Sequence, residues 1–283
     1  MTEPAVFAGV ADSLRTATNL LSATSDTPRL DAELLMAHAL GIERQALLLD
    51  PARHAVPDLY AHLIARRMAH EPMAYILGYR DFWTIRVAVG PGVLIPRPDS
   101  ETLIEACLDL GRERGAGWPG TILDLGTGPG TLLLAALGEF PGATGLGVDT
   151  SEYALAYARD NAEELGLADR VAFRSGDWGA GLDGPFDLIL CNPPYIGDTE
   201  ILMPDVADHE PGEALFAGPD GLDDYRRIIP DLPRLLAPGG AAVLEIGAAQ
   251  HISVGELARA AGFDVTCRQD LAGRDRALLL TRT

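Results

Sequence analysis

The tetrapeptide Asn192-Pro193-Pro194-Tyr195 carries the most specific chemistry in the sequence. Each proline fixes its own backbone and forces the residue before it into an extended conformation, so the segment is stiff. The Asn192 carboxamide and the Pro193 carbonyl then offer hydrogen-bond acceptors at a fixed spacing, which suits a planar –NH2 group. Tyr195 adds a flat face on which a planar amide or base can stack. The plain alternative is a Pro-rich loop that only turns the chain.

Acceptors arranged in this way can activate a weak nucleophile. The nitrogen of an amide or an aniline-like amine reacts poorly, because its lone pair is delocalised. Acceptors that hold both N–H bonds can orient this nitrogen toward an electrophile and favour the developing pyramidal geometry. No strong base is required before the attack. We therefore predict that Asn192, Pro193, Pro194 and Tyr195 form a catalytic segment.

A second motif, Gly126-Thr127-Gly128-Pro129-Gly130, follows a predicted strand and opens a predicted helix. Glycines let the backbone turn tightly and pass close to a ligand. Open parallel sheets bind ligands at the carboxyl ends of their strands, which is where this loop would lie. Thr131 occupies the position at which a dinucleotide-binding loop has its third glycine, so a dehydrogenase is disfavoured. The alternative is a tight strand-to-helix turn without a ligand.

Three more side chains follow the next predicted strands at the same end of the sheet. Asp149 ends the second strand, where its carboxylate can accept hydrogen bonds from both ribose hydroxyls. Asp177 and Trp178 follow the third strand, where the carboxylate can meet an adenine amino group and the indole can pack on the ring. Together with the glycine loop they predict a nucleoside pocket, although an Asp in solvent and a Trp used only for packing are the alternatives.

From about residue 100 the sequence alternates between strands and helices. Strands are predicted at 121–125, 143–148, 171–174, 186–191, 241–246, 263–268 and 277–281, and helices at 131–137, 152–165 and 254–261. Near-continuous apolar strands joined by helical crossovers predict a mostly parallel sheet with both faces covered. The short link between the last two strands favours an antiparallel pair at one edge.

The part before this sheet is predicted to be helical, with helices over 30–40 and 58–68 separated by prolines. Apolar residues then alternate over 82–89, and Gly90-Pro91-Gly92 is predicted to turn the chain into 93–95 as a β-hairpin. We therefore expect a helical domain 1–78, a β-hairpin connector 79–97 and an α/β domain 98–283.

The charge balance and the apolar runs exclude several classes of protein. There are 22 basic and 41 acidic residues, a net charge of −19, which disfavours a nucleic-acid substrate because such binding relies on a basic surface. No apolar run approaches the ~20 residues of a membrane span. Residues 1–9 lack the pattern of a secretory signal, and the three cysteines are too few and scattered for a disulfide framework or a zinc ribbon. We expect a cytoplasmic monomer that uses no metal and meets neither membrane nor nucleic acid.

The predicted sheet, the glycine loop, Asp149 and the tetrapeptide together resemble the S-adenosylmethionine-dependent methyltransferases that act on planar –NH2 groups. The tetrapeptide alone does not separate enzymes acting on adenine from enzymes acting on protein glutamine. Further segments resemble the peptide chain release factor glutamine methyltransferases: Arg66-Arg67, Glu71-Pro72, 75–78, Phe82-Trp83, 94–101, 209–211, 214–215, 218–222 and 270–276. The resemblance runs from about residue 60 to residue 283. The sequence departs from the family pattern at His70, Ser100 and Pro129, the last of which removes a loop N–H.

This resemblance implies an α/β fold with a seven-stranded, mostly parallel, Rossmann-like methyltransferase sheet and an N-terminal helical domain joined by a β-hairpin. It implies methyl transfer from S-adenosyl-L-methionine to the glutamine amide of the Gly-Gly-Gln tripeptide in peptide chain release factors. Asn192 and the Pro193 carbonyl would hold the amide, with Tyr195 stacking on it. The cofactor would bind at Gly126, Thr127, Gly128, Pro129, Gly130, Asp149, Asp177, Trp178 and Asn192.

The helical head and hairpin would, by the same resemblance, dock the release factor. Arg97 and Glu101 lie near the domain joint and would either shape the peptide channel or pair with each other. Two other functions stay open. A DNA or RNA adenine methyltransferase predicts a basic groove beside Tyr195, and a non-catalytic adaptor predicts cofactor binding without turnover.

Overall fold

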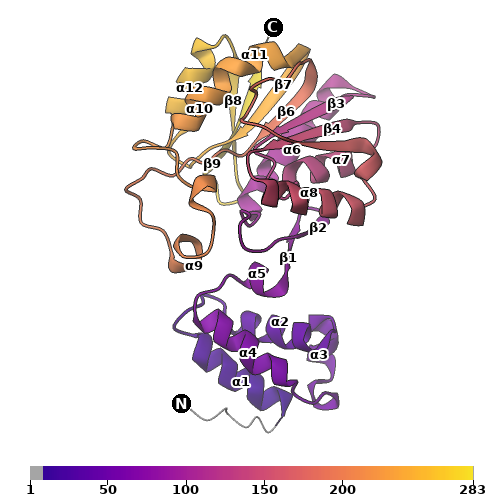
Figure 1. Ribbon diagram of the computed structural model, residues 1–283, viewed down its shortest axis with the longest axis vertical. Coiled ribbons are helices and arrows are strands. Elements are labelled where there is room, and N and C mark those ends of the chain that lie inside the picture. The colour runs from indigo at the N-terminus through magenta and orange to yellow at the C-terminus, as the bar shows by residue number, and fades with distance from the viewer. Residues whose placement is uncertain (1–8, 283) are drawn as a thin grey trace. The chain divides into compact units, whose positions relative to one another are not determined.

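The computed structural model describes residues 9–282, shown as a ribbon in Figure 1. The prediction that no secretory signal is present concerns residues 1–9, of which 1–8 lie outside the described part. The chain divides into two compact units. Unit 1 is Met1–Gly78 with Leu202–His209, and unit 2 is Tyr79–Ile201 with Glu210–Thr283. The division made from the sequence places residues 202–209 in the domain 98–283, because no change in composition marks them.

Unit 1 is helical. Its elements are α1 (Val10–Leu21), α2 (Pro28–Leu40), α3 (Arg44–Leu49), the 3₁₀ turn η1 (Pro51–Arg53), α4 (Asp58–Met68), α5 (Met73–Leu77) and α9 (Pro204–Ala207). Helix α2 begins at Pro28, whose fixed φ suits the first helical position, and ends at Gly41, whose φ of +65° closes the helix. Its core includes Leu14, Met36 and Tyr60, which come from α1, α2 and α4.

Unit 2 is built on a seven-stranded sheet with the strand order β5-β4-β3-β6-β7-β9-β8. The strands are β3 (Thr121–Leu125), β4 (Thr144–Asp149), β5 (Val171–Ser175), β6 (Phe186–Cys191), β7 (Leu236–Glu245), β8 (Asp264–Gln269) and β9 (Asp275–Thr281). Strands β3 to β7 run parallel, whereas β9 is antiparallel to both of its neighbours. The predicted sheet and its antiparallel edge are confirmed.

Helices cover both faces of the sheet (Figure 1). They are α6 (Glu101–Arg114), α7 (Thr131–Glu139), α8 (Glu152–Glu164), α10 (Asp223–Ile228), α11 (Leu232–Leu235) and α12 (His251–Ala260), with 3₁₀ turns η2 (Pro98–Ser100), η3 (Ala168–Arg170), η4 (Gly212–Ala214) and η5 (Ile229–Asp231). Helices α6, α7 and α8 pack on one face, and α10, α11 and α12 pack on the other. Among residues 9–282, no helix is long and apolar enough to span a membrane.

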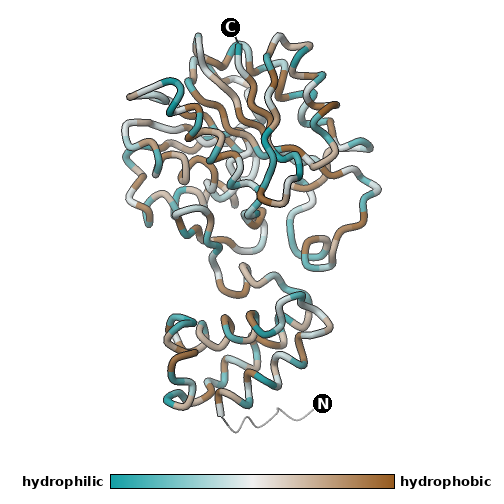
Figure 2. Tube along the Cα trace, turned by 180° about the vertical axis from the view of Figure 1, so that it is seen from behind, coloured by the Kyte–Doolittle hydropathy of each residue, from teal (hydrophilic) through white to brown (hydrophobic). Residues whose placement is uncertain are grey.

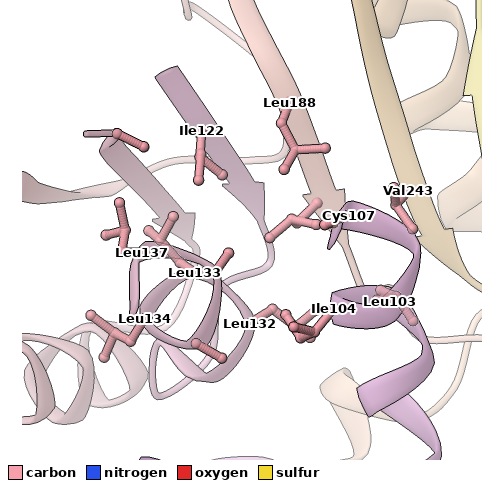
Figure 3. Close-up of a cluster of buried hydrophobic side chains, with 14 of the residues drawn as sticks. Leu103, Ile104, Cys107, Ile122, Leu132, Leu133, Leu134, Leu137, Leu188 and Val243 are labelled. Carbon is pink, nitrogen blue, oxygen red and sulfur yellow. The ribbon is translucent and has the colours of Figure 1, made fainter. Parts of the chain in front are cut away.

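The strands of this sheet are apolar on both sides because each face carries its own core. Along β6, Leu188 and Leu190 belong to one hydrophobic cluster, whereas Ile189 and Cys191 belong to the other. Figure 3 shows the first cluster, in which side chains of α6 and α7 meet those of β3, β6 and β7. In Figure 2 the strands at the centre of unit 2 are accordingly largely brown, the colour of hydrophobic residues. This two-sided burial produces the near-continuous apolar runs seen in the sequence.

The predicted β-hairpin is present, but its turn lies elsewhere. Strands β1 (Tyr79–Phe82) and β2 (Ile85–Ala88) pair antiparallel, and the last pair, Phe82 with Ile85, leaves Trp83 and Thr84 as the turn. Trp83 has a φ of +52°, which is rare for a bulky residue. Its backbone N–H donates to Glu101 at 2.9 Å and its indole donates to Glu139 at 2.7 Å. These contacts with α6 and α7 hold a turn that no local signal predicts.

The turn expected at Gly90-Pro91-Gly92 is therefore wrong as the hairpin turn. Gly90 does accept a hydrogen bond from Val93, but the chain that follows forms no strand. Of the two alternatives for Arg97 and Glu101, a pair between them is not present in the described structure. Glu101 instead accepts from the Trp83 N–H, and Arg97 pairs with Glu210. Glu210 also accepts a hydrogen bond from the Ile95 N–H at 3.0 Å, so it fixes the segment that leads into α6.

Candidate active site

One pocket of unit 2 lies where the carboxyl ends of β3, β4, β5 and β6 meet. Most of the predicted site residues line it: Gly126, Thr127, Gly128, Pro129, Asp149, Asp177, Trp178, Asn192 and Pro194. The other three do not. Gly130 caps α7 behind the loop, Pro193 is buried, and Tyr195 is half-buried in the same segment as Asn192. Parallel strands bring these distant residues to one edge because all their carboxyl ends point the same way.

The glycine loop lets the backbone approach its neighbours closely. Gly126, Gly128 and Gly130 have φ values of +71°, +55° and +85°, the left-handed region that favours glycine. A Cβ on Gly126 would lie 2.8 Å from Cζ3 of Trp178, so the indole packs directly on this glycine. A side chain at Gly126 would therefore displace the indole from the pocket wall.

The N–H groups of this loop are already used within the protein. Those of Gly126 and Thr127 both donate to the Val148 carbonyl, at 2.8 and 2.9 Å, and that of Gly128 donates to Asp149 Oδ2 at 2.8 Å. A loop that binds the pyrophosphate of a dinucleotide needs free N–H groups for the phosphate oxygens. The geometry here suits a nucleoside ligand without phosphates, in agreement with Thr131 at the position of the third glycine.

Asp149 lies at the end of β4 with both carboxylate oxygens facing backbone donors. Oδ2 accepts from Gly128 and Oδ1 accepts from the Ser151 N–H at 2.8 Å. Each oxygen keeps a further lone pair with which to accept another hydrogen bond. Burial raises the pKa of this carboxyl, and the backbone donors oppose that shift. Asp149 is thus a fixed acceptor on the pocket wall.

Asp177 and Trp178 are held by partners that the sequence did not suggest. The exposed Asp177 carboxylate forms an ion pair with Arg227. The Trp178 indole Nε1 donates to Asp224 Oδ1 at 3.1 Å, and Trp178 has a φ of +48°. Arg227 also lies 3.4 Å from Asp224. The Asp224 hydrogen bond therefore fixes the orientation of the indole, and the Asp177 carboxylate is paired with the Arg227 guanidinium.

Asp124, inside β3, is a pocket residue that the sequence interpretation missed as a ligand group. It is buried and lines the pocket, and its Oδ2 accepts from Thr127 Oγ1 at 2.7 Å. Its Oδ1 is buried without a hydrogen-bond partner. Burial raises the pKa of Asp124 to about 7. A lone carboxyl in an otherwise apolar strand was the available signal, and a cationic ligand group would satisfy its free oxygen.

The tetrapeptide is anchored at both of its ends. The Asn192 Nδ2 makes a long contact of 3.5 Å with Ser100 Oγ. The Tyr195 hydroxyl donates to Glu245 Oε1 at 3.4 Å, and the Tyr195 carbonyl accepts from Gln250 Nε2 at 2.9 Å. Burial raises the pKa of the Tyr195 hydroxyl, so this group stays protonated. None of these partners was named from the sequence as a site residue.

Acidic side chains outnumber basic ones around the pocket. Its charged lining consists of Asp124, Asp149, Asp177, Glu213 and Asp224 against Arg97 and Arg227. Both arginines are already ion-paired, Arg97 with Glu210 and Arg227 with Asp177 and Asp224. A pocket wall with a net negative charge attracts a cationic ligand and repels a polyanion.

One group of side chains in the described part of the chain offers several metal-ligand atoms. His251, Cys267 and Asp275 place one such atom each within 4.8 Å of one another. They already contact each other, since His251 Nδ1 lies 2.9 Å from Asp275 Oδ2, and none of them lines the pocket. Burial raises the pKa of the Cys267 thiol to about 11, which disfavours the thiolate that binds metals. We assign no metal here, and the expectation of a metal-free site stays a prediction.

Comparison with known proteins identifies the family of both units. The family model described as PrmC N-terminal domain matches residues 12–78, and the one described as Methyltransferase domain matches residues 120–267. A release factor glutamine methyltransferase of Rhodospirillum rubrum is 45% identical, over 95% of this chain and 83% of its own. One from Bradyrhizobium diazoefficiens is 43% identical, over 98% of this chain and 96% of its own.

The crystal structure of a methyltransferase from Pyrococcus furiosus shares the fold. It has a TM-score of 0.52 at 19% identity and covers 69% of this chain and 88% of its own. The curated relatives agree with this chain over nearly its whole length, across the helical unit as well as the sheet. The protein therefore belongs to the release factor glutamine methyltransferase family.

Proposed function

We propose that the protein transfers a methyl group from S-adenosyl-L-methionine to the side-chain amide nitrogen of a release factor glutamine, the glutamine of the Gly-Gly-Gln motif. Membership of the family supports the substrate and the donor. The observation that carries the chemistry is the position of the stiff tetrapeptide: Asn192 and Pro194 form part of the wall of the acidic pocket. An acceptor for an amide and a site for a cationic donor therefore adjoin each other.

The residues of the pocket fit S-adenosyl-L-methionine by charge and by hydrogen bonding. Asp124 Oδ1, buried without a partner, would accept from the ammonium group of the ligand. Asp149 has lone pairs left for the ribose hydroxyls, and Gly126 allows close approach beside the indole of Trp178. When bound, the ligand supplies an electrophilic methyl group on a positively charged sulfur.

The tetrapeptide would bind and orient the amide of the substrate glutamine. The Asn192 Oδ1 and the Pro193 carbonyl would accept from the two N–H bonds of the glutamine amide, with Tyr195 stacking on its plane. Positive charge develops on the nitrogen and its hydrogens as the new bond forms, and fixed acceptors stabilise that charge more than they stabilise the neutral amide. Because the acceptors are held by prolines, little reorganisation is needed at the moment of reaction.

The proposal also covers the docking of the release factor, the oligomeric state and the cellular location. Residues 1–78 and the hairpin would form the docking face for the release factor, with residues 98–283 as the methyltransferase domain. We propose a cytoplasmic monomer that binds neither nucleic acid nor membrane. The net charge of −19 supports the absence of nucleic-acid binding. Methylation of DNA or RNA by the purified protein would instead support the adenine methyltransferase. Donor binding without turnover on any release factor would support the adaptor.

The test is methyl transfer from a labelled donor to each purified release factor, with the modified residue mapped by mass spectrometry. Asn192→Ala should lower turnover by about a hundredfold or more, the scale of removing one fixed group that stabilises a transition state. Gln269→Ala is a matched control, because it removes an exposed carboxamide from the edge strand β8. Near-normal turnover of Asn192→Ala, with its melting temperature unchanged, would refute the proposed acceptor.

A further inference from the structure

Glu210 is a buried carboxyl that joins two segments of the pocket wall and has no part in the function proposed above. Its side chain is 1% exposed. Its Oε2 accepts from the Ile95 N–H at 3.0 Å, and its Oε1 accepts from Arg97 Nη2. Both carboxylate oxygens are therefore occupied, one by a neutral backbone donor and the other by a cation.

The two segments that Glu210 joins are far apart in the chain. One precedes α6 and the other follows Glu210 directly, and their pocket-lining residues are Val93, Leu94, Pro96 and Arg97 in the first and Pro211, Glu213 and Ala214 in the second. The second segment continues to Phe216, which forms an isolated β-bridge with Ile196. Ile196 is the residue after the tetrapeptide, so Glu210 connects the segment 93–97 to the chain that leaves the tetrapeptide.

Arg97 depends on Glu210 for its opposite charge. Among the described residues, Glu210 is the one carboxylate within ion-pair distance of Arg97. The other arginine of the pocket, Arg227, pairs with both Asp177 and Asp224, so the loss of one partner leaves it a second. The Arg97 side chain is 33% exposed and lines the pocket, so its charge is accessible to a ligand. Without Glu210, the pocket wall would contain an unpaired cation.

The charge of Arg97 acts on the tetrapeptide. Burial and the nearby Glu245 raise the pKa of the Tyr195 hydroxyl, and the positive charges of Arg276 and Arg97 oppose that shift. Arg97 and Asn192 also line the same pocket. Two unit charges that share a partly buried site interact strongly enough to change an affinity severalfold. An unpaired Arg97 would therefore repel a ligand that carries a positive charge beside the tetrapeptide.

We propose that Glu210 is a positioning residue that holds and neutralises Arg97 at the pocket wall, so that the pocket prefers the positively charged sulfur of the methyl donor to the neutral sulfur of the product. This inference deepens the proposed function and rests on it. S-adenosyl-L-methionine and S-adenosyl-L-homocysteine share the nucleoside, the ammonium and the carboxylate, and they differ in the methyl group and the charge on sulfur. A contact that holds only the shared parts changes both affinities equally, whereas an unpaired cation weakens mainly the binding of the donor.

The first test measures the affinities of both ligands for the full chain by calorimetry, without a release factor. Glu210→Gln keeps the size of the side chain and an oxygen for the Ile95 N–H, but it removes the charge that faces Arg97. The variant should bind S-adenosyl-L-methionine about fivefold more weakly, and S-adenosyl-L-homocysteine within about twofold of the natural protein. Added salt should reduce this difference, because it screens exposed charges. Glu256→Gln is the matched control, because it removes an exposed negative charge from α12 and should leave both affinities unchanged.

The second test reverses the sign of the charge that is left unpaired. Arg97→Met leaves the Glu210 carboxylate without its cation, so the preference should shift toward the donor by about twofold or more. The double variant, Glu210→Gln with Arg97→Met, carries neither charge and should restore the natural ratio of the two affinities within about twofold. Neutral side chains can replace a buried ion pair at little cost in stability, so these two variants also test the inference if Glu210→Gln alone does not fold.

An unchanged ratio of the two affinities in Glu210→Gln would overturn the inference, even if both affinities fell, because equal losses indicate that Glu210 only holds the two segments together. So would a double variant that keeps the altered ratio, or a shift of Arg97→Met in the same direction as Glu210→Gln. If the natural protein binds the donor but methylates no release factor, the proposed function fails, and the two affinities still decide the role of Glu210.

Discussion

Replacing Arg67 with methionine should destabilise unit 1 by about 3 kcal/mol, because it removes the guanidinium that pairs with the buried Asp31 and the partly exposed Asp205. The Arg67 side chain is 7% exposed. It donates to Asp31 Oδ2 at 2.9 Å, to Asp205 Oδ2 at 2.7 Å and to the carbonyls of Thr24 and Glu71 at 3.0 and 3.2 Å. Asp205 belongs to α9, so this one guanidinium also binds the segment Leu202–His209 to the helices of unit 1.

The size of this loss of stability depends on which hydrogen-bond partners each carboxylate retains in the variant. Removing one partner of a buried ion pair costs roughly 3–5 kcal/mol. Asp31 retains hydrogen bonds from Ser25 and Thr27, at 2.8 and 3.2 Å, and Asp205 is 23% exposed and can turn to water, so we expect the lower end. Arg66→Met is the matched control. Arg66 is 32% exposed and pairs with the partly exposed Glu71, a contact worth about 1 kcal/mol or less.

The two units can be monitored separately. All three tryptophans, Trp83, Trp118 and Trp178, lie in unit 2, so their fluorescence reports on the sheet. Amide hydrogen exchange of α1, α2 and α4 reports on unit 1. Arg67→Met should speed the slowest of these amides by about a hundredfold, which corresponds to about 3 kcal/mol, and should remove protection from Leu202–His209. Unchanged exchange in unit 1, or an equal effect of Arg66→Met, would refute the assignment of a buried ion pair.

Three further predictions concern unit 2. Gly126→Ala places a Cβ 2.8 Å from the Trp178 ring at a φ of +71°. It should lower the free energy of unfolding by about 1–2 kcal/mol and weaken donor binding measured by calorimetry. Gly138→Ala, with open space around it, should not destabilise the protein. Asp149→Asn should weaken donor binding by about tenfold or more, because hydrogen bonds to a charged group are worth ~1.5–3 kcal/mol. If the variant binds the donor with the same affinity as the natural protein, Asp149 does not contact the ligand. Burial raises the pKa values of Asp124 and Glu245 to about 7. Both raised values make the folded state bind more protons than the unfolded one, so the free energy of unfolding should fall as pH rises from about 5 to 8, by up to about 1.4 kcal/mol per pH unit for each group. Urea midpoints across this range should show a shallower slope in Glu245→Gln.

Local patterns in the sequence were enough to determine most of the secondary structure and the loops of the site. The helix predicted over 58–68 is α4, and the strands predicted over 121–125 and 186–191 are β3 and β6 with the same bounds. Glycines with positive φ and consecutive prolines restrict the backbone by themselves, whatever surrounds them. Periodic apolar residues likewise show which side of a helix or strand is buried. The glycine loop and the tetrapeptide were therefore recognisable before any contact was known.

Only the tertiary structure decided which side chain meets which. Arg67 is buried against Asp31 and Asp205, Arg97 pairs with Glu210 rather than Glu101, and the hairpin turns at Trp83. The Glu245 carboxyl contacts the Tyr195 hydroxyl because β7 lies beside β6, although Tyr195 is 50 positions earlier in the chain. Ion pairs and hydrogen bonds act over a few ångströms between residues that are distant in sequence, so their partners depend on how the strands and helices pack and not on local composition.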